Sequence, residues 1–247
     1  MSATRPGWKR GPAISAGPHI LLAGHGAPRH AAAQASILAH AAALAGATGA
    51  TVRAGFLAAE PSLAESAAAF DDAPISVLPM FMADGYLVRS AVPRALGRPA
   101  RILRPLGLMP RLAEVIAARA LACCAASGIV PARSTLLLLG HGSAHGDASR
   151  QAVSSQAERV AGTALFGSVE IAFLKESPRL DEQCRRCCGD VVVMGFFAAP
   201  GAHAIDDVPD LMAGASTCGN RTLAYAGAVG ADPGIVRLLA DAIVEAP

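Results

Sequence analysis

Short apolar runs alternate along the chain with longer, alanine-rich segments whose apolar residues recur at helical spacing. The short runs are rich in Leu, Ile and Val, which is typical of buried strands in βαβ units and therefore of a parallel sheet. The predicted strands cover residues 19–24, 51–57, 75–80, 101–106, 135–140, 169–174, 190–195 and 222–226. The predicted helices cover residues 31–47, 63–70, 88–96, 110–126, 149–165, 178–187, 204–212 and 233–245. Asp232, before Pro233, is the predicted N-cap of the last helix.

The same pattern occurs twice, and a Gly-His-Gly motif opens each copy. Four landmarks recur 116 residues apart, which predicts a duplication without gaps: His25 with His141, Glu60 with Glu176, Phe81 with Phe197, and Pro93 with Pro209. In this register His203 of the second copy stands where the first copy has Leu87. The second half therefore holds a complete His/Glu/His set, whereas the first half has a leucine in place of the second histidine.

The repeat predicts two tandem domains in the 247 residues. We place the N-terminal half, with the incomplete site, at residues 18–127 and the C-terminal half, with the complete site, at 134–247, joined by a linker at 127–134. Residues 1–17 are basic and rich in Pro and Gly without an apolar centre, which predicts a flexible tail rather than a secretory signal.

Composition narrows the class of protein further. Hydrophobic residues make up 53% of the chain, yet no uncharged apolar stretch reaches the roughly 20 residues that a membrane-spanning helix needs. The adjacent pairs Cys123-Cys124 and Cys187-Cys188 do not fit a secreted disulfide framework. Cys184-x-x-Cys187 has no second pair at metal-site spacing, so we interpret it as reduced thiols on a helix. These features predict a cytoplasmic protein that binds neither membrane nor nucleic acid.

Charge differs between the two halves of the sequence. Residues 1–125 contain twelve basic and six acidic residues, a net charge of +6, and residues 126–247 contain nine and thirteen, a net charge of −4. This asymmetry suits a ligand that is anionic on one side and meets a metal cation on the other, although ordinary surface charge explains it as well.

Three candidate metal ligands follow three successive predicted strands of the second half. His141 follows the strand at 135–140, Glu176 the strand at 169–174, and His203 the strand at 190–195. Because ligands bind beyond the carboxyl ends of strands in open parallel sheets, we expect the three side chains to meet at one edge. Two imidazoles and a carboxylate suit Co²⁺, Fe²⁺, Ni²⁺ or Zn²⁺, and three protein ligands leave positions open for catalysis or transfer.

Other residues are expected to complete the site. Gly142 and Gly201 allow close approach to a ligand, and Ser143 directly follows Gly142. Arg89 and Arg94 begin the helix after the corresponding loop of the first half, where their guanidinium groups could pair with a polycarboxylate or simply face solvent. We interpret His19, His30 and His40 as capping or core residues. For His145 two interpretations stay open: it supports the site from beside the ligands, or it has no role in it.

At this point the sequence resembles a known family. The GHG motifs, FLKESP and PGAH-x-x-x-DVP resemble the sirohydrochlorin chelatases of the CbiX/SirB type, and the likeness covers the chain from about residue 19 onward. It implies an α/β fold of two tandem lobes, each a parallel sheet flanked by helices in flavodoxin-like layers, with a cleft between them. It also implies insertion of Co²⁺ or Fe²⁺, with Ni²⁺ as a further candidate, into sirohydrochlorin without a nucleotide, for cobalamin or siroheme synthesis.

The resemblance assigns roles to individual residues. The family's first histidine corresponds to His141 and to His25, and its second to His203, with Glu176 adding a carboxylate. Gly142, Ser143 and Gly201 would line the tetrapyrrole site, and Arg89 and Arg94 would hold the peripheral carboxylates. Family members of this length commonly keep the intact histidine pair in the first half, so this chain departs from the pattern. A monomer or a homodimer fits a two-lobed chain.

Several alternatives remain beside the chelatase. One is a non-catalytic metal- or tetrapyrrole-binding protein, such as a metallochaperone, descended from the enzyme. A serine hydrolase is disfavoured because the G-x-S-x-G elbow needs a glycine where His141 stands. A phosphohistidine enzyme would have an arginine at Gly140, and a dinucleotide site would have a glycine at His145.

Overall fold

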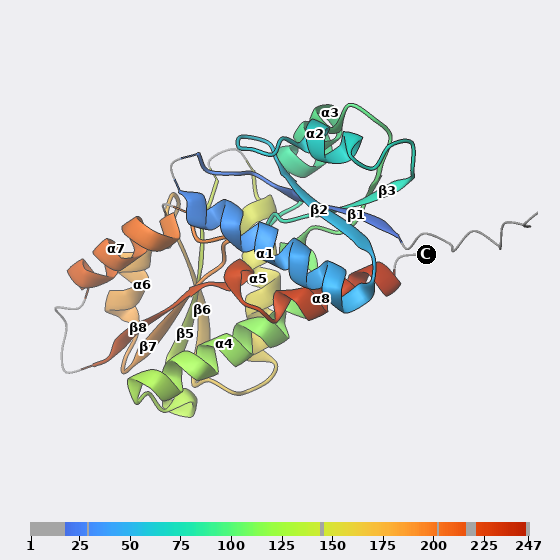
Figure 1. Ribbon diagram of the computed structural model, residues 1–247. Coiled ribbons are helices and arrows are strands. Elements are labelled where there is room, and N and C mark those ends of the chain that lie inside the picture. Colours follow the sequence, from blue (N-terminus) through green and yellow to red (C-terminus); the bar gives the residue numbers. More distant parts are fainter. Residues whose placement is uncertain (1–17, 29, 144–145, 202, 216–220, 246–247) are drawn as a thin grey trace, which may run out of the picture.

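The computed structural model describes residues 18–28, 30–143, 146–201, 203–215 and 221–245, so the predicted tail at 1–17 lies outside the described residues. The chain forms two four-stranded parallel sheets (Figure 1). The first sheet has the order β2-β1-β3-β4 and the strands β1 (His19–Gly24), β2 (Thr51–Phe56), β3 (Ile75–Pro79) and β4 (Arg101–Ile102). The second has the order β6-β5-β7-β8 and the strands β5 (Thr135–Gly140), β6 (Ser168–Phe173), β7 (Val191–Gly195) and β8 (Leu223–Ala228).

Helices cover both faces of each sheet, which confirms the predicted α/β class and its layering. The α-helices are α1 (Ala31–Thr48), α2 (Leu63–Ala68), α3 (Val92–Leu96), α4 (Leu112–Ser127), α5 (Ala148–Ala161), α6 (Leu180–Arg186), α7 (Val208–Ala215) and α8 (Ile235–Val244). Every residue of β5 and β7 is buried, as expected for central parallel strands covered on both faces. No helix of the described part of the chain is long and apolar enough to cross a bilayer.

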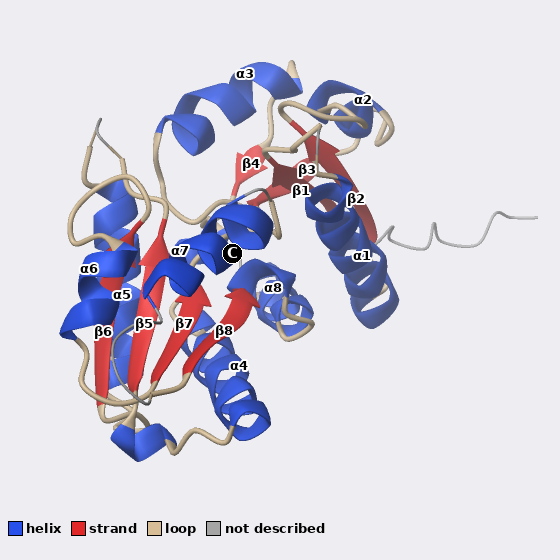
Figure 2. Cartoon of the chain, turned by 90° about the vertical axis from the view of Figure 1, so that its left-hand side faces the viewer, coloured by secondary structure: helices blue, strands red, loops and turns tan. Residues whose placement is uncertain are grey.

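The two halves exchange their last helices. α4 follows the first sheet in sequence but packs on β7, β8 and α5 of the second, and α8 follows the second sheet but packs on α1 (Figures 1 and 2). Side chains of α1, α4, α5 and α8, among them Leu44, Ile116, Val160 and Leu239, belong to one apolar core that reaches both sheets. The boundary predicted at 127–134 therefore follows the repeat in sequence, whereas the packing crosses it.

Two buried polar side chains tie the halves together reciprocally. His40 Nε2 on α1 lies 2.8 Å from the Gly230 carbonyl oxygen of the second half. Gln156 Nε2 on α5 donates at 3.0 Å to the carbonyls of both Gly107 and Met109 in the first half. His40 and Gln156 occupy equivalent positions, because they are 116 residues apart in the two copies. A carbonyl can only accept, so His40 carries its proton on Nε2.

Two predicted helices, one predicted strand and one predicted N-cap differ from the structure. The helix predicted at 88–96 begins as a π-helical turn, η1 (Leu87–Ala91), and the helix predicted at 204–212 begins as the equivalent turn η4 (His203–Asp207). The strand predicted at 101–106 shortens to β4, since Pro105 lacks an N–H and the chain turns there into a 3₁₀ segment. The N-cap of α8 is Gly234, and Asp232 instead accepts a hydrogen bond from the Gly234 N–H.

Replacing His40 with alanine is expected to lower the free energy of unfolding by about 1–3 kcal/mol, because the Gly230 carbonyl loses its partner in the core. Urea unfolding followed by circular dichroism measures this. His30→Ala is the control, since His30 makes no side-chain capping hydrogen bond at the start of α1. Equal stability of the two variants would show that the His40 hydrogen bond contributes nothing.

Candidate functional site

The second sheet brings the three segments that carry the candidate ligands together. β6, β5 and β7 are neighbours in the sheet, and His141, Glu176 and His203 come after β5, β6 and β7 respectively. β5 and β7 are the first and third strands of the second half and lie next to each other in the sheet (Figure 2). The strand order reverses between them, so the connecting segments leave in opposite directions, and ligands bind at this point in such folds. His141 follows β5, and His203 begins the helical segment after β7.

The Gly-His-Gly turn fixes the orientation of the His141 ring. Its Nδ1 lies 2.9 Å from the carbonyl oxygen of Gly142. Because that carbonyl only accepts, the neutral imidazole carries its proton on Nδ1 and its lone pair on Nε2. His141 is exposed at the end of the strand. His25 makes the same contact with the Gly26 carbonyl at 2.8 Å, so both turns present the same tautomer.

Gly142 brings Glu176 against this turn. Its φ of +78° lies in the left-handed region, and a Cβ there would lie 2.8 Å from Glu176 Cγ and 3.1 Å from Glu176 Oε1. The missing side chain thus leaves the space that the glutamate occupies. Gly201 has no such constraint among the described residues, since none of their atoms lies within 4 Å of the position of a Cβ and its φ is outside the left-handed region. Ser143, next in the chain, is half-buried.

Arg150 on α5 holds Glu176 from the other side. Its Nη2 donates to Glu176 Oε2 at 2.7 Å and to the Ser177 carbonyl at 2.6 Å. The guanidinium carbon lies 4.6 Å from the centre of the Phe173 ring, at cation–π distance. Sequence reasoning missed Arg150, because it lies within a predicted helix and matches no motif spacing.

The structure corrects the predicted match between Glu60 and Glu176. Gly24 pairs with Phe56 in the first sheet, whereas Gly140 pairs with Phe173 in the second, so the separation grows from 116 to 117 residues at the second strand. The cis peptides Glu60-Pro61 and Ser177-Pro178 show the same shift. A Cβ on Gly26 would meet Ala59, just as one on Gly142 would meet Glu176. Glu176 therefore corresponds to Ala59, and the gap-free alignment at Glu60 is wrong.

The separation returns to 116 residues at the third strand. Leu87 and His203 each begin a π-helical turn, so their predicted equivalence is confirmed. π-Helical turns are rare and occur frequently at functional sites. The first half thus keeps only His25, with alanine and leucine where the second half has Glu176 and His203. The side chain of His203 and all of His145 lie outside the described residues, and among the rest no three His, Cys, Asp or Glu side chains could hold a metal ion.

The arginines between residues 89 and 104 separate into different surroundings. Arg89 pairs with Asp84 at 3.0 Å, which raises the pKa of Arg89, and both it and Arg94 are exposed on the segment after the β3 loop. Arg98 has a structural role, since it donates to the carbonyls of Ala67, Asp71 and Ala73 at the end of α2. A cavity of about 400 Å³ between β4 and α8 is lined by Arg101 and Arg104, among other residues.

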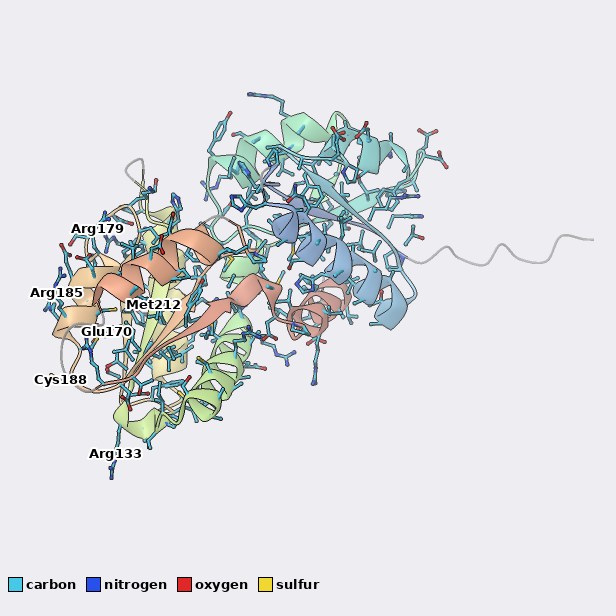
Figure 3. All side chains as sticks on the ribbon, turned by 60° about the vertical axis from the view of Figure 1, so that its left-hand side comes forward. Arg133, Glu170, Arg179, Arg185, Cys188 and Met212 are labelled. Atoms are coloured by element: carbon cyan, nitrogen blue, oxygen red, sulfur yellow. The ribbon has the colours of Figure 1, made fainter. Side chains whose placement is uncertain are left out.

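The cysteines of the described part of the chain lie away from the candidate site. Cys187 and Cys188 line a pocket together with Thr135 and Ser168, the first residues of β5 and β6, and Figure 3 shows Cys188 at the periphery of the second half. Cys184 is buried, and desolvation raises its pKa to about 11, so it is a neutral thiol at physiological pH. The five cysteines among the described residues are free. Their placement agrees with the interpretation of Cys184-x-x-Cys187 as reduced thiols.

At pH 8, iodoacetamide is expected to modify the exposed Cys188 well before Cys184, because only the thiolate reacts and the pKa of Cys184 is raised. Peptide mass mapping over time measures both rates. The difference should vanish in denaturant. Equal rates in the folded protein would contradict the burial of Cys184.

Comparison with known proteins agrees with the doubled sheet and its two Gly-His-Gly turns. The CbiX family model matches residues 19–122 and again residues 135–246. The fold and the repeated site thus define a two-repeat α/β protein with the architecture of the tetrapyrrole chelatases. The chain belongs to the CbiX family.

Three relatives show how far the likeness extends. A probable sirohydrochlorin cobaltochelatase of Halobacterium salinarum is 23% identical over 238 residues, which cover 78% of each chain. The structure of CbiX described as the terminal enzyme of siroheme biosynthesis in denitrifying bacteria has a TM-score of 0.80 at 28% identity, covering 93% of this chain and 99% of that one. A third relative, SirB of Bacillus subtilis subspecies spizizenii, is a sirohydrochlorin chelatase solved with cobalt. It shares the fold, with a TM-score of 0.72 at 17% identity, and the match covers 93% of this chain and 94% of that one.

Replacing Gly142 with alanine is expected to lower the free energy of unfolding by about 1 kcal/mol or more, since the new Cβ has an unfavourable φ and displaces Glu176. Gly201→Ala is the matched control and should change stability little, because no atom of the described residues lies within 4 Å of the new Cβ. Thermal unfolding of both variants compares them. Equal losses would mean that the contact between Gly142 and Glu176 does not constrain the turn.

Proposed function

We propose that this protein inserts a divalent metal into sirohydrochlorin or a closely related tetrapyrrole, without a nucleotide, and that the reaction takes place at the second sheet. The observation that carries this proposal is the asymmetry of the repeat. Both halves keep the Gly-His-Gly turn, but only the second adds a carboxylate beside it and a histidine at the start of the following π-helical turn. The names of two relatives, a sirohydrochlorin cobaltochelatase and a siroheme-pathway enzyme, point to the same class of macrocycle.

The metal is the substrate, and we propose Co²⁺ or Fe²⁺, with Ni²⁺ as a further candidate. One relative is named for cobalt and another for siroheme, an iron product. Imidazole and carboxylate ligands suit all three ions, so the cell's supply of metal would select among them. Depending on the metal, the product would serve cobalamin or siroheme synthesis.

The chain's residues would share the work as follows. His141 offers the Nε2 lone pair to the metal, with Glu176 and His203 from the neighbouring loops. As the metal enters the macrocycle, the two pyrrole N–H protons must leave, and a neutral histidine can accept a proton near neutral pH. Protonation of a ligand histidine would at the same time release the metal from it. Gly142, Ser143 and Gly201 would lie beside the macrocycle, and Arg89 and Arg94 would pair with its carboxylates.

A second candidate is a protein that binds metal or tetrapyrrole without turnover. The observation that favours it is the loss already seen in the first half, where Ala59 and Leu87 replace Glu176 and His203. A metallochaperone would bind the metal tightly and leave the macrocycle unmetallated.

Replacing both His141 and His203 with alanine is expected to reduce sirohydrochlorin metallation to the uncatalysed rate, because the metal loses both imidazole ligands. Absorbance under anaerobic conditions follows the reaction with Co²⁺, Fe²⁺ and Ni²⁺ in parallel. His25→Ala is the matched control, since His25 has the same turn and tautomer in the half that lacks the other ligands. It should retain most of the activity.

Two outcomes would contradict the proposal. Activity that survives the double replacement but is lost in His25→Ala would move the reaction to the first sheet. Metal binding without acceleration for any of the three metals would favour the non-catalytic binder.

A further inference from the structure

We propose that Arg150 is a positioning residue that holds the Glu176 carboxylate and keeps the metal site weak enough to release its ion. This inference rests on the proposed function, since it concerns a metal that is passed on. The printed sequence gives no motif for Arg150, and the role follows from its contacts in the folded chain.

The two oxygens of Glu176 face different partners. Oε2 accepts from Arg150 Nη2 at 2.7 Å. Oε1 lies on the side of the Gly-His-Gly turn, 3.1 Å from the position that a Cβ on Gly142 would occupy. Arg150 thus occupies one oxygen and leaves the other beside the His141 turn, so the carboxylate can give a metal at this turn one oxygen.

Arg150 is itself fixed by two further contacts. Its Nη2 also donates to the Ser177 carbonyl at 2.6 Å, and its guanidinium lies over the Phe173 ring. Phe173 is fully buried at the end of β6, directly beside Gly140 in the sheet. The arginine therefore has a defined place relative to the turn, although about a third of its side chain is accessible to solvent.

The repeat provides an internal comparison for this pair. Gly24 is approached by Ile37 and Gly140 by Val153, so α1 and α5 align with a separation of 116 residues. Arg150 lies three residues before Val153, and Gln34 lies three residues before Ile37. Gln34 donates to the Ala27 carbonyl at 3.1 Å. In the first half Gln34 stands in place of Arg150 and Ala59 in place of Glu176, so both members of the pair are absent. The first half also lacks the second histidine.

The charge of Arg150 has a direct consequence for a cation. Paired with Arg150, Glu176 adds a ligand oxygen but little net negative charge to the site. A positive charge close to a divalent ion opposes its binding by an amount that corresponds to about tenfold in affinity even at the dielectric constant of water. The metal is then held mainly by neutral ligands, which suits an ion that must leave for a macrocycle.

Arg150→Gln tests the inference, because the first half shows that this position of the helix accommodates glutamine. We expect the variant to bind Co²⁺ alone about tenfold more tightly in isothermal titration calorimetry. In sirohydrochlorin metallation its kcat should fall several-fold. Arg150→Lys keeps the charge and should stay near the wild-type affinity. In a Glu176→Gln background, Arg150→Gln should still tighten Co²⁺ binding by a similar factor, because the repulsion between the guanidinium and the cation does not require the carboxylate.

Arg185→Gln is the matched control, since Arg185 pairs with Asp181 at 2.6 Å within α6 and lies on the outer surface of the molecule (Figure 3). It should leave Co²⁺ affinity and kcat unchanged. Unchanged or weaker Co²⁺ binding by folded Arg150→Gln would overturn the inference, even if metallation by the wild type confirms the function. Tighter binding without metallation by any form would support the inference and overturn the proposed function.

Discussion

The exchange of α4 and α8 is the constraint on which the rest of the structure depends. Each sheet needs apolar helices on both faces. α4 covers part of the second sheet although it follows the first in sequence, and α8 packs on α1 of the first half although it follows the second sheet. The halves therefore share one core and cannot separate without exposing it. His40 and Gln156 sit at equivalent places in this core and bind backbone carbonyls of the opposite half. Their hydrogen bonds join the two halves within this core.

Within this frame the two copies of the site have diverged in chemistry while keeping their backbone. Both halves retain a left-handed glycine after the histidine, a cis peptide before the second helix and a π-helical turn after the third strand. The side chains on these features differ, with Glu176 and Arg150 in one half and Ala59 and Gln34 in the other. A preserved backbone with changed side chains is expected when one half changes its role while the shared core still requires both folds.

The two halves also differ in net charge, in the same sense as the proposed site requires. The first half is basic, and its Arg89 and Arg94 are exposed on the segment after the β3 loop. The second half is acidic and carries the proposed metal ligands. A macrocycle with carboxylates at its edge and a metal at its centre would meet complementary charge on both sides.

The sequence by itself determined the α/β class, both sheets, the doubled Gly-His-Gly turn and the equivalence of Leu87 with His203, because hydrophobic periodicity and glycine placement are local signals. Only the tertiary structure decided the partner of Glu176. A one-residue shift leaves the motif spacing similar, whereas strand pairing and the space beside Gly142 permit a single register. The exchange of α4 and α8 and the Arg150 contact were equally hidden. They join residues that are distant in sequence, and such contacts follow from packing rather than from any local pattern.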